Sequence, residues 1–201
     1  NETLNVTKFT LEVCVKVHEI GGVQHLLNKG GSTTSARNYD LEVWEDGYEF
    51  RKRQSDGTWE TMSRFGVFET RTWYILHAIL TSDLKARVYI NSELAQEKQW
   101  SYPPDFTTDP LFIGSNTGTS NFLNGIIAFV RIYNRALSPR EIRWNMLEYH
   151  NPVRDGLVLF LYDRIVDGTW YDESGYGNEG TIYGAVRKEL AMWEIRAELG
   201  L

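Results

Sequence analysis

The segment from residue 124 to residue 142, NGIIAFVRIYNRALSPREI, constrains the fold more than any other part of the chain. A β-rich run, IIAFVRIY, is followed by the turn NRAL and then by the start of a helix. Ser138 is a good N-cap residue, Pro139 has no amide that needs a partner, and Glu141 completes a capping box. The segment therefore predicts a strand followed by a short helix near residues 139–149.

Strand-like runs separated by turn signals fill most of the chain before this helix. Apolar and polar residues alternate over 9–17, and the runs 39–44 and 48–53 flank an Asp-Gly pair that is typical of a tight hairpin turn. Further strand-like runs cover 73–80 and 87–90. The pattern predicts an all-β protein, and a length of 201 residues fits one sandwich domain.

The segment 124–142 resembles the closing part of laminin-G-like domains of the concanavalin A-like superfamily. Residues 73–100, WYILHAILTSDLKARVYINSELAQEKQW, are similar to the central strands of that family, although Ser92 stands where glycine is usual. The resemblance implies a two-sheet antiparallel jelly-roll sandwich, with the short helix described above.

Residues 156–185, GLVLFLYDRIVDGTWYDESGYGNEGTIYGA, resemble the opening strands of such a domain, yet here they follow its closing segment. Three arrangements are open. The displaced segment completes its own sandwich, completes a neighbouring copy by strand exchange, or begins a second repeat of a longer surface protein. We favour the first, which makes residues 1–201 a single domain.

The last residues, 186–201, read VRKELAMWEIRAELGL and combine strong helix formers with an amphipathic pattern. We expect a C-terminal helix that packs on its own sandwich. The alternative is a docking helix for a partner subunit, so that self-association through 156–201 stays open.

Composition excludes several other classes of protein. The formal net charge is −6, and no basic cluster extends beyond residues 51–53, so nucleic acid is not an expected partner. No apolar run approaches the ~18 residues needed to cross a bilayer. Cys14 is the only cysteine, which excludes an intramolecular disulfide, and the four histidines lack zinc-type spacing.

An enzyme is the minority hypothesis. Glycoside hydrolases of the same superfamily use two carboxylates on one strand face, and Asp40 and Glu42 fit that spacing. The hydrolase strand carries Glu-x-Asp-x-Glu, however, and here the third acid, Glu45, falls out of phase. We therefore interpret the pair as acids on a solvated strand face and assign no catalytic residue. We expect His77 to be a core histidine.

The resemblance implies a calcium ion at one edge of the domain. Its candidate side-chain ligands are Asp172 and Asn178, in the loop DESGYGN. The same loop is equally well explained as a turn built by Asx hydrogen bonds and glycines. The family also places acidic residues where this chain has Ala128 and Phe129, which removes possible ligands.

A sugar site requires an exposed aromatic platform with hydrogen-bonding groups nearby. Six aromatic residues are candidates because they are expected at strand ends or in loops: Trp44, Tyr48, Trp59, Trp100, Tyr102 and Tyr176.

The resemblance implies a non-catalytic binding module that acts outside the cytoplasm, at a cell or virion surface, and binds a glycan or another surface macromolecule for adhesion or targeting. The alternative is a structural subunit of a virion, tail fibre or surface filament that assembles by strand exchange. A glycoside hydrolase is the third hypothesis.

Overall fold

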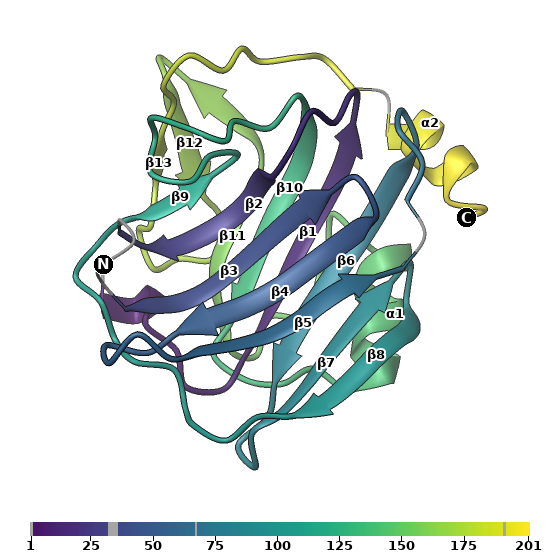
Figure 1. Cartoon of the computed structure of the whole chain (residues 1–201). Coiled ribbons are helices and arrows are strands. Elements are labelled where there is room, and N and C mark those ends of the chain that lie inside the picture. Colours follow the sequence, from purple (N-terminus) through teal and green to yellow (C-terminus); the bar gives the residue numbers. More distant parts are fainter. Residues whose placement is uncertain (1, 32–35, 67, 191) are drawn as a thin grey trace.

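Two antiparallel β-sheets packed face to face form the body of the protein (Figure 1). The computed structural model describes residues 2–31, 36–66, 68–190 and 192–201. One sheet has eight strands in the order β13-β12-β11-β10-β1-β6-β7-β8, and the other has five in the order β5-β4-β3-β2-β9. The all-β two-sheet sandwich expected from the strand pattern is confirmed.

The strands of the eight-stranded sheet are β1 (Phe9–Val17), β6 (Trp73–Leu80), β7 (Lys85–Ile90), β8 (Glu93–Gln99), β10 (Gly125–Tyr133), β11 (Leu157–Val166), β12 (Thr169–Asp172) and β13 (Gly180–Thr181). Those of the five-stranded sheet are β2 (Gln24–Gly30), β3 (Arg37–Trp44), β4 (Gly47–Arg53), β5 (Trp59–Phe65) and β9 (Leu111–Ile113). The helical elements are a 3-10 turn at Glu2–Leu4, α1 (Pro139–Leu147) and α2 (Met192–Glu198).

The central strand β1 shows how both faces of the eight-stranded sheet are used. Its residues Leu11 and Val13 pack into the main core between the sheets. Cys14, one step out of phase, belongs to a second apolar cluster on the opposite face, which α1 and α2 help to form. Because both faces are covered, the strict alternation of β1 does not expose Cys14.

Helix α1 begins as its sequence predicts. The Ser138 hydroxyl accepts a hydrogen bond from the Glu141 amide at 3.3 Å, and the Glu141 carboxylate accepts one from the Ser138 amide at 2.8 Å. Ile142 and Met146 are buried in the second cluster, together with Phe160 of β11. Figure 1 shows α1 behind the eight-stranded sheet, on the side away from the five-stranded one.

The displaced segment 156–185 forms β11, β12 and β13 at one end of the eight-stranded sheet. Strand β11 pairs antiparallel with β10 of the same chain, with Leu161 opposite Val130 and Phe160 opposite Arg131. This is the arrangement in which the tail completes its own sandwich.

The C-terminal helix is shorter than expected. Residues 186–190 are not helical, and α2 begins at Met192. Ile195 is buried and Glu198 pairs with Lys16 at 2.7 Å, but Trp193 is 71% exposed. Only a narrow stripe of the tail meets the sandwich, and an unpacked stretch of this length does not hold a helix in water. Among the described residues, neither helix has the length and apolarity to cross a bilayer.

Candidate functional site

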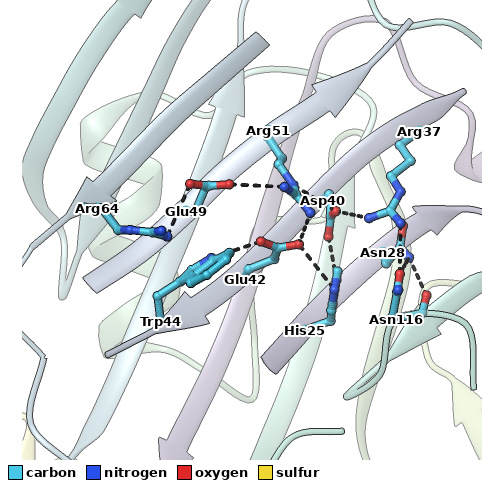
Figure 2. A network of polar contacts seen from close by, with 10 residues as sticks. All are labelled: His25, Asn28, Arg37, Asp40, Glu42, Trp44, Glu49, Arg51, Arg64 and Asn116. Carbon is cyan, nitrogen blue, oxygen red and sulfur yellow. Dashed lines mark hydrogen bonds and ion pairs between the residues drawn. The ribbon is translucent and has the colours of Figure 1, made fainter. Parts of the chain in front are cut away.

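Charged side chains cover the outer face of the five-stranded sheet, and alternation along its strands places them there. On β3, Leu41 and Val43 point into the main core, so Asp40 and Glu42 point outward. On β4, Phe50 points inward and Arg51 outward. Figure 2 shows the resulting network, which we call the polar face. Its members are His25, Asn28, Arg37, Asp40, Glu42, Trp44, Glu49, Arg51, Arg64 and Asn116.

His25 on β2 lies between the two carboxylates of β3. Its Nδ1 is 2.9 Å from Asp40 Oδ1, and its Nε2 is 3.2 Å from Glu42 Oε1. A register shift in the β2–β3 pair between His25 and Leu27 brings His25 opposite Glu42. We call His25, Asp40 and Glu42 the triad.

Two arginines surround the triad. Arg37 Nη1 donates to Asp40 Oδ2 at 2.5 Å. Arg51 bridges the acids, with Nε 3.2 Å from Asp40 Oδ2 and Nη2 in contact with Glu42 Oε1. Trp44 Nε1 donates to the remaining oxygen, Glu42 Oε2, at 3.0 Å. Every oxygen of both carboxylates therefore faces at least one nitrogen of the protein.

The two carboxyl groups respond oppositely to this environment. Burial acts to raise the pKa of Asp40, but the hydrogen bond from His25 and the charges of His25, Arg37 and Arg51 outweigh it and hold the pKa below its ordinary value. Burial and the adjacent charge of Asp40 raise the pKa of Glu42 to about 8, against the opposing charge of Arg51. One group of the pair thus favours the ionised form and the other the protonated form.

Separated pKa values in adjacent carboxyls are what acid–base catalysis uses, but access is lacking here. The side chains of Asp40 and Glu42 are 0% exposed, and their oxygens are engaged as described above. The expectation that they lie on a solvated strand face was wrong, because arginines and the ring of Trp44 cover them. That they are not a catalytic pair stays a prediction, and their burial supports it.

A metal ion does not fit the triad either. One ligand atom from each of its three residues lies within 4.8 Å of the others, a spacing that could in principle hold a cation. Arg37 and Arg51 already supply positive charge to the same oxygens. A cation would have to displace both guanidinium groups.

Two of the six predicted aromatics border the polar face. Trp59 on β5 is 40% exposed, and the guanidinium carbon of Arg51 lies 4.4 Å from its ring centroid, with those of Arg37 and Arg53 at 5.6 and 5.8 Å. Trp44 is half-buried, and the guanidinium of Arg64 lies 3.8 Å from its ring. Arginines therefore hold both indoles in place.

The other four aromatic candidates lie elsewhere. Tyr48 and Trp100 are buried in the main core, so the expectation that they form an exposed platform was wrong. Tyr48 shares its strand face with the inward-pointing Phe50, and Trp100 packs on that phenyl ring with centroids 4.8 Å apart. Tyr102 and Tyr176 are exposed, in the loops that follow β8 and β12.

The predicted calcium loop is held together by its own hydrogen bonds. The carboxylate of Asp172 accepts from the amides of Phe160, Ser174 and Asn178, each at 2.9 Å, and from the Ser174 hydroxyl at 2.7 Å. Asn178 donates to the Val158 carbonyl at 2.7 Å. Four donors fill the acceptor capacity of a carboxylate, so this donor set fits a turn better than a cation. Calcium at this loop stays a prediction.

A second polar cluster lies beneath α1, on the outer face of the eight-stranded sheet. Glu12 and Arg131 are fully buried and paired at 2.8 Å, and Asn145 of α1 donates to the other oxygen of Glu12 at 2.9 Å. His77 is buried, as expected for a core histidine, with Nε2 3.5 Å from Glu12, but among the described residues neither of its ring nitrogens has a hydrogen-bond partner. The helix closes this cluster from solvent.

Sequence reasoning singled out Asp40, Glu42, Trp44 and Trp59 but missed their partners. His25, Arg37 and Arg51 carry no motif. The available signal was alternation: Arg51 lies out of phase with Phe50 and therefore shares the outer face with the acids of the neighbouring strand.

The comparisons with known proteins agree with the fold. Residues 1–143 match the family model Laminin_G_3, described as the concanavalin A-like lectin/glucanases superfamily. The match leaves out the displaced segment 156–185. No curated protein matches the chain.

Three solved structures illustrate the likeness. A Bacteroides ovatus protein provisionally assigned to carbohydrate binding is 18% identical, with a TM-score of 0.68 over 88% of this chain and 54% of that one. The CBM40 module of Ruminococcus gnavus IT-sialidase, bound to α2,3-sialyllactose, is 16% identical, with a TM-score of 0.59 over 70% of this chain and 83% of the module. The receptor-binding domain of botulinum neurotoxin type G is 10% identical, with a TM-score of 0.59 over 72% of this chain and 39% of that one. This chain spans about half the length of the Bacteroides protein.

Proposed function

Because the chain belongs to the concanavalin A-like lectin/glucanase superfamily, we propose that it is a non-catalytic carbohydrate-binding module whose ligand contacts the polar face beside Trp59. The module acts outside the cytoplasm, at a cell or particle surface, in adhesion or targeting. Among solved structures of the same fold, the Ruminococcus module bound to a sialylated sugar and the provisionally assigned Bacteroides protein support this proposal.

The exposed indole of Trp59 is the observation that carries the proposal. Three guanidinium groups lie within 6 Å of its ring, and one of them, that of Arg51, is fixed by Asp40 and Glu42. A sugar ring stacks on a rigid aromatic surface without a large loss of side-chain entropy, because the surface is ordered before binding. Hydroxyl groups of the sugar would meet the polar rim formed by Arg51, Glu49 and Arg64.

The burial of the two acids supports the non-catalytic part of the proposal. A hydrolase needs one carboxyl group to reach the glycosidic oxygen and the other to reach the anomeric carbon or a water. Asp40 and Glu42 offer no exposed oxygen to a sugar on this face. The ligand would therefore be held and released unchanged.

The test is binding to a glycan array, followed by calorimetry with the sugar that gives the strongest signal. Trp59→Ala should weaken binding at least tenfold, the effect expected when a central aromatic anchor loses ~1.4 kcal/mol or more. Trp193→Ala is the matched control, because Trp193 is an exposed tryptophan on α2, whose Ile195 packs in the second apolar cluster on the far side of the eight-stranded sheet. Wild-type affinity in Trp59→Ala, or an array without any bound glycan, would contradict the proposal.

A further inference from the structure

Both ring nitrogens of His25 face carboxylate oxygens at hydrogen-bond distance. A neutral imidazole carries one N–H and one lone pair, so it donates to only one acceptor. If Asp40 and Glu42 were both ionised, one of the two contacts would set a lone pair against a lone pair. The contact between Nε2 and Glu42 is favourable when Glu42 carries a proton, because the carboxylic acid can donate to the ring nitrogen.

Charged groups from β3, β4 and β5 surround the triad and are joined by ion pairs. Those of the polar face are Arg37, Asp40, Glu42, Glu49, Arg51 and Arg64. Two more lie at its border, Arg53 beside Trp59 and Asp46, which pairs with Arg64 at 2.9 Å. Glu42 therefore meets the negative charges of Asp40 and Glu49 as well as the positive charge of Arg51.

We propose that a proton on Glu42, shared with Nε2 of His25, keeps the polar face assembled at neutral pH, and that its release on the alkaline side loosens this face and weakens ligand binding. The folding part of this inference stands alone, whereas the binding part rests on the proposed function. Without the proton, Nε2 and Glu42 Oε1 repel each other across the β2–β3 pair.

Two contacts would transmit a movement of the Glu42 side chain to the proposed ligand-binding surface. Trp44 Nε1 donates to Glu42 Oε2, so the carboxyl group positions that indole. Arg51 binds the same carboxyl group and stacks on Trp59. Both tryptophans at the border of the polar face therefore depend on the ionisation state of one side chain.

The direction of the pH dependence follows from the raised pKa of Glu42. A carboxyl group whose pKa is about 8 in the folded protein and near its ordinary 4.5 in the unfolded chain stabilises the fold most when it is protonated. Its contribution is complete below about pH 4.5 and is lost as the pH rises to about 8. Over this window the unfolding equilibrium constant should rise about tenfold per pH unit from this one proton.

The experiment compares urea unfolding of the wild type, Glu42→Gln and Glu49→Gln between pH 5 and pH 9. Glu42→Gln should remove the tenfold change per pH unit. Glu49→Gln, which removes another acid beside Arg51 on the same face, should keep it. A difference between the wild type and Glu42→Gln that does not vary with pH would overturn the proposal.

Two further readouts keep the test decisive. If Glu42→Gln does not fold, ¹³C NMR of wild-type protein labelled at glutamate and histidine should show one triad group releasing its proton between about pH 7 and pH 9, and no such release would overturn the inference. Calorimetry with the array-selected glycan at pH 6.5 and pH 9 should show weaker binding at pH 9. The unfolding and NMR readouts use no ligand, so an absence of glycan binding would refute the proposed function and leave the proton inference standing.

Discussion

Replacing Arg131 by methionine would test how strongly one buried ion pair stabilises this sandwich. Arg131 and Glu12 have no exposed side-chain surface, and Arg131 Nη1 lies 2.8 Å from Glu12 Oε1. The guanidinium also stacks on Phe129 and Phe160, at 4.1 and 4.9 Å from their ring centroids. Methionine keeps much of this packing volume and removes the charge, so the variant isolates the electrostatic role.

The magnitude follows from the pKa of Glu12. Burial alone would raise that pKa, but the charge of Arg131, together with the nearby His77, lowers it from 4.5 to about 2. At about 1.4 kcal/mol for each pH unit, this drop corresponds to roughly 3–4 kcal/mol of stability at neutral pH. Breaking a buried pair by removing one partner typically costs about 3–5 kcal/mol, which is the same range.

The loss should depend on pH with a definite sign. In the wild type, the depressed pKa means that Glu12 stabilises the fold above about pH 4.5 and that this contribution is lost as the pH falls toward 2. In Arg131→Met, burial without the arginine favours the protonated acid, so acidification relieves the defect. The difference in unfolding free energy should be about 3–5 kcal/mol at pH 7 and clearly smaller at pH 3.5.

Urea unfolding followed by tryptophan fluorescence at both pH values measures this difference. Arg87→Met is the matched control, because Arg87 pairs with Glu97 on the solvent-exposed part of the same sheet and should change stability little at either pH. An equal loss for Arg131→Met at pH 7 and pH 3.5 would refute the electrostatic explanation and assign the cost to packing.

Four further outcomes are expected. Ser138→Ala removes the side-chain half of the capping box, the bond from the Glu141 amide to the Ser138 hydroxyl, and should lower the unfolding free energy by about 1 kcal/mol in urea titrations. Gly125→Ala would place a Cβ 2.5 Å from the Lys16 carbonyl oxygen between β10 and β1, so circular dichroism should show a lower Tm. Calcium chloride added to dialysed protein should leave Tm unchanged, since Asp172 already accepts four hydrogen bonds, and a rise would favour a calcium site there. In light scattering the full chain should be a monomer, because residues 156–185 pair with their own sheet, whereas a dimer lost on removal of 156–201 would favour strand exchange.

Local signals were sufficient for much of the fold. The capping box fixed the start of α1, because Ser138 and Glu141 interact with each other and not with distant residues. The Asp-Gly turn predicted the β3–β4 hairpin, in which Trp44 pairs with Gly47. Alternation predicted β1 in the same way. Each of these features depends on residues close together in the sequence.

The polar face could be predicted only in part, because it depends on the register between strands. His25 meets Glu42 through an irregularity in the β2–β3 pairing, and the position of such a bulge is not encoded in a readable local pattern. The interpretation of Asp40 and Glu42 as solvated acids failed because arginines and the ring of Trp44 cover them. Tyr48 is a different case. Alternation already places its side chain on the same inward face as Phe50, so its position near a strand end does not make it exposed.

The two buried clusters use the same three side-chain types, and the number of acids decides what each can do. Under α1, one carboxylate meets Arg131 and His77, and its pKa falls to about 2. On the polar face, Asp40 adds a second negative charge next to Glu42, and the pKa of Glu42 rises to about 8. The first cluster holds a fixed charge across the physiological pH range and is closed by a helix, so its role is stability. The second changes charge within that range and is covered by arginines and tryptophans at a surface, so it is the cluster whose state a ligand or a change of pH can alter.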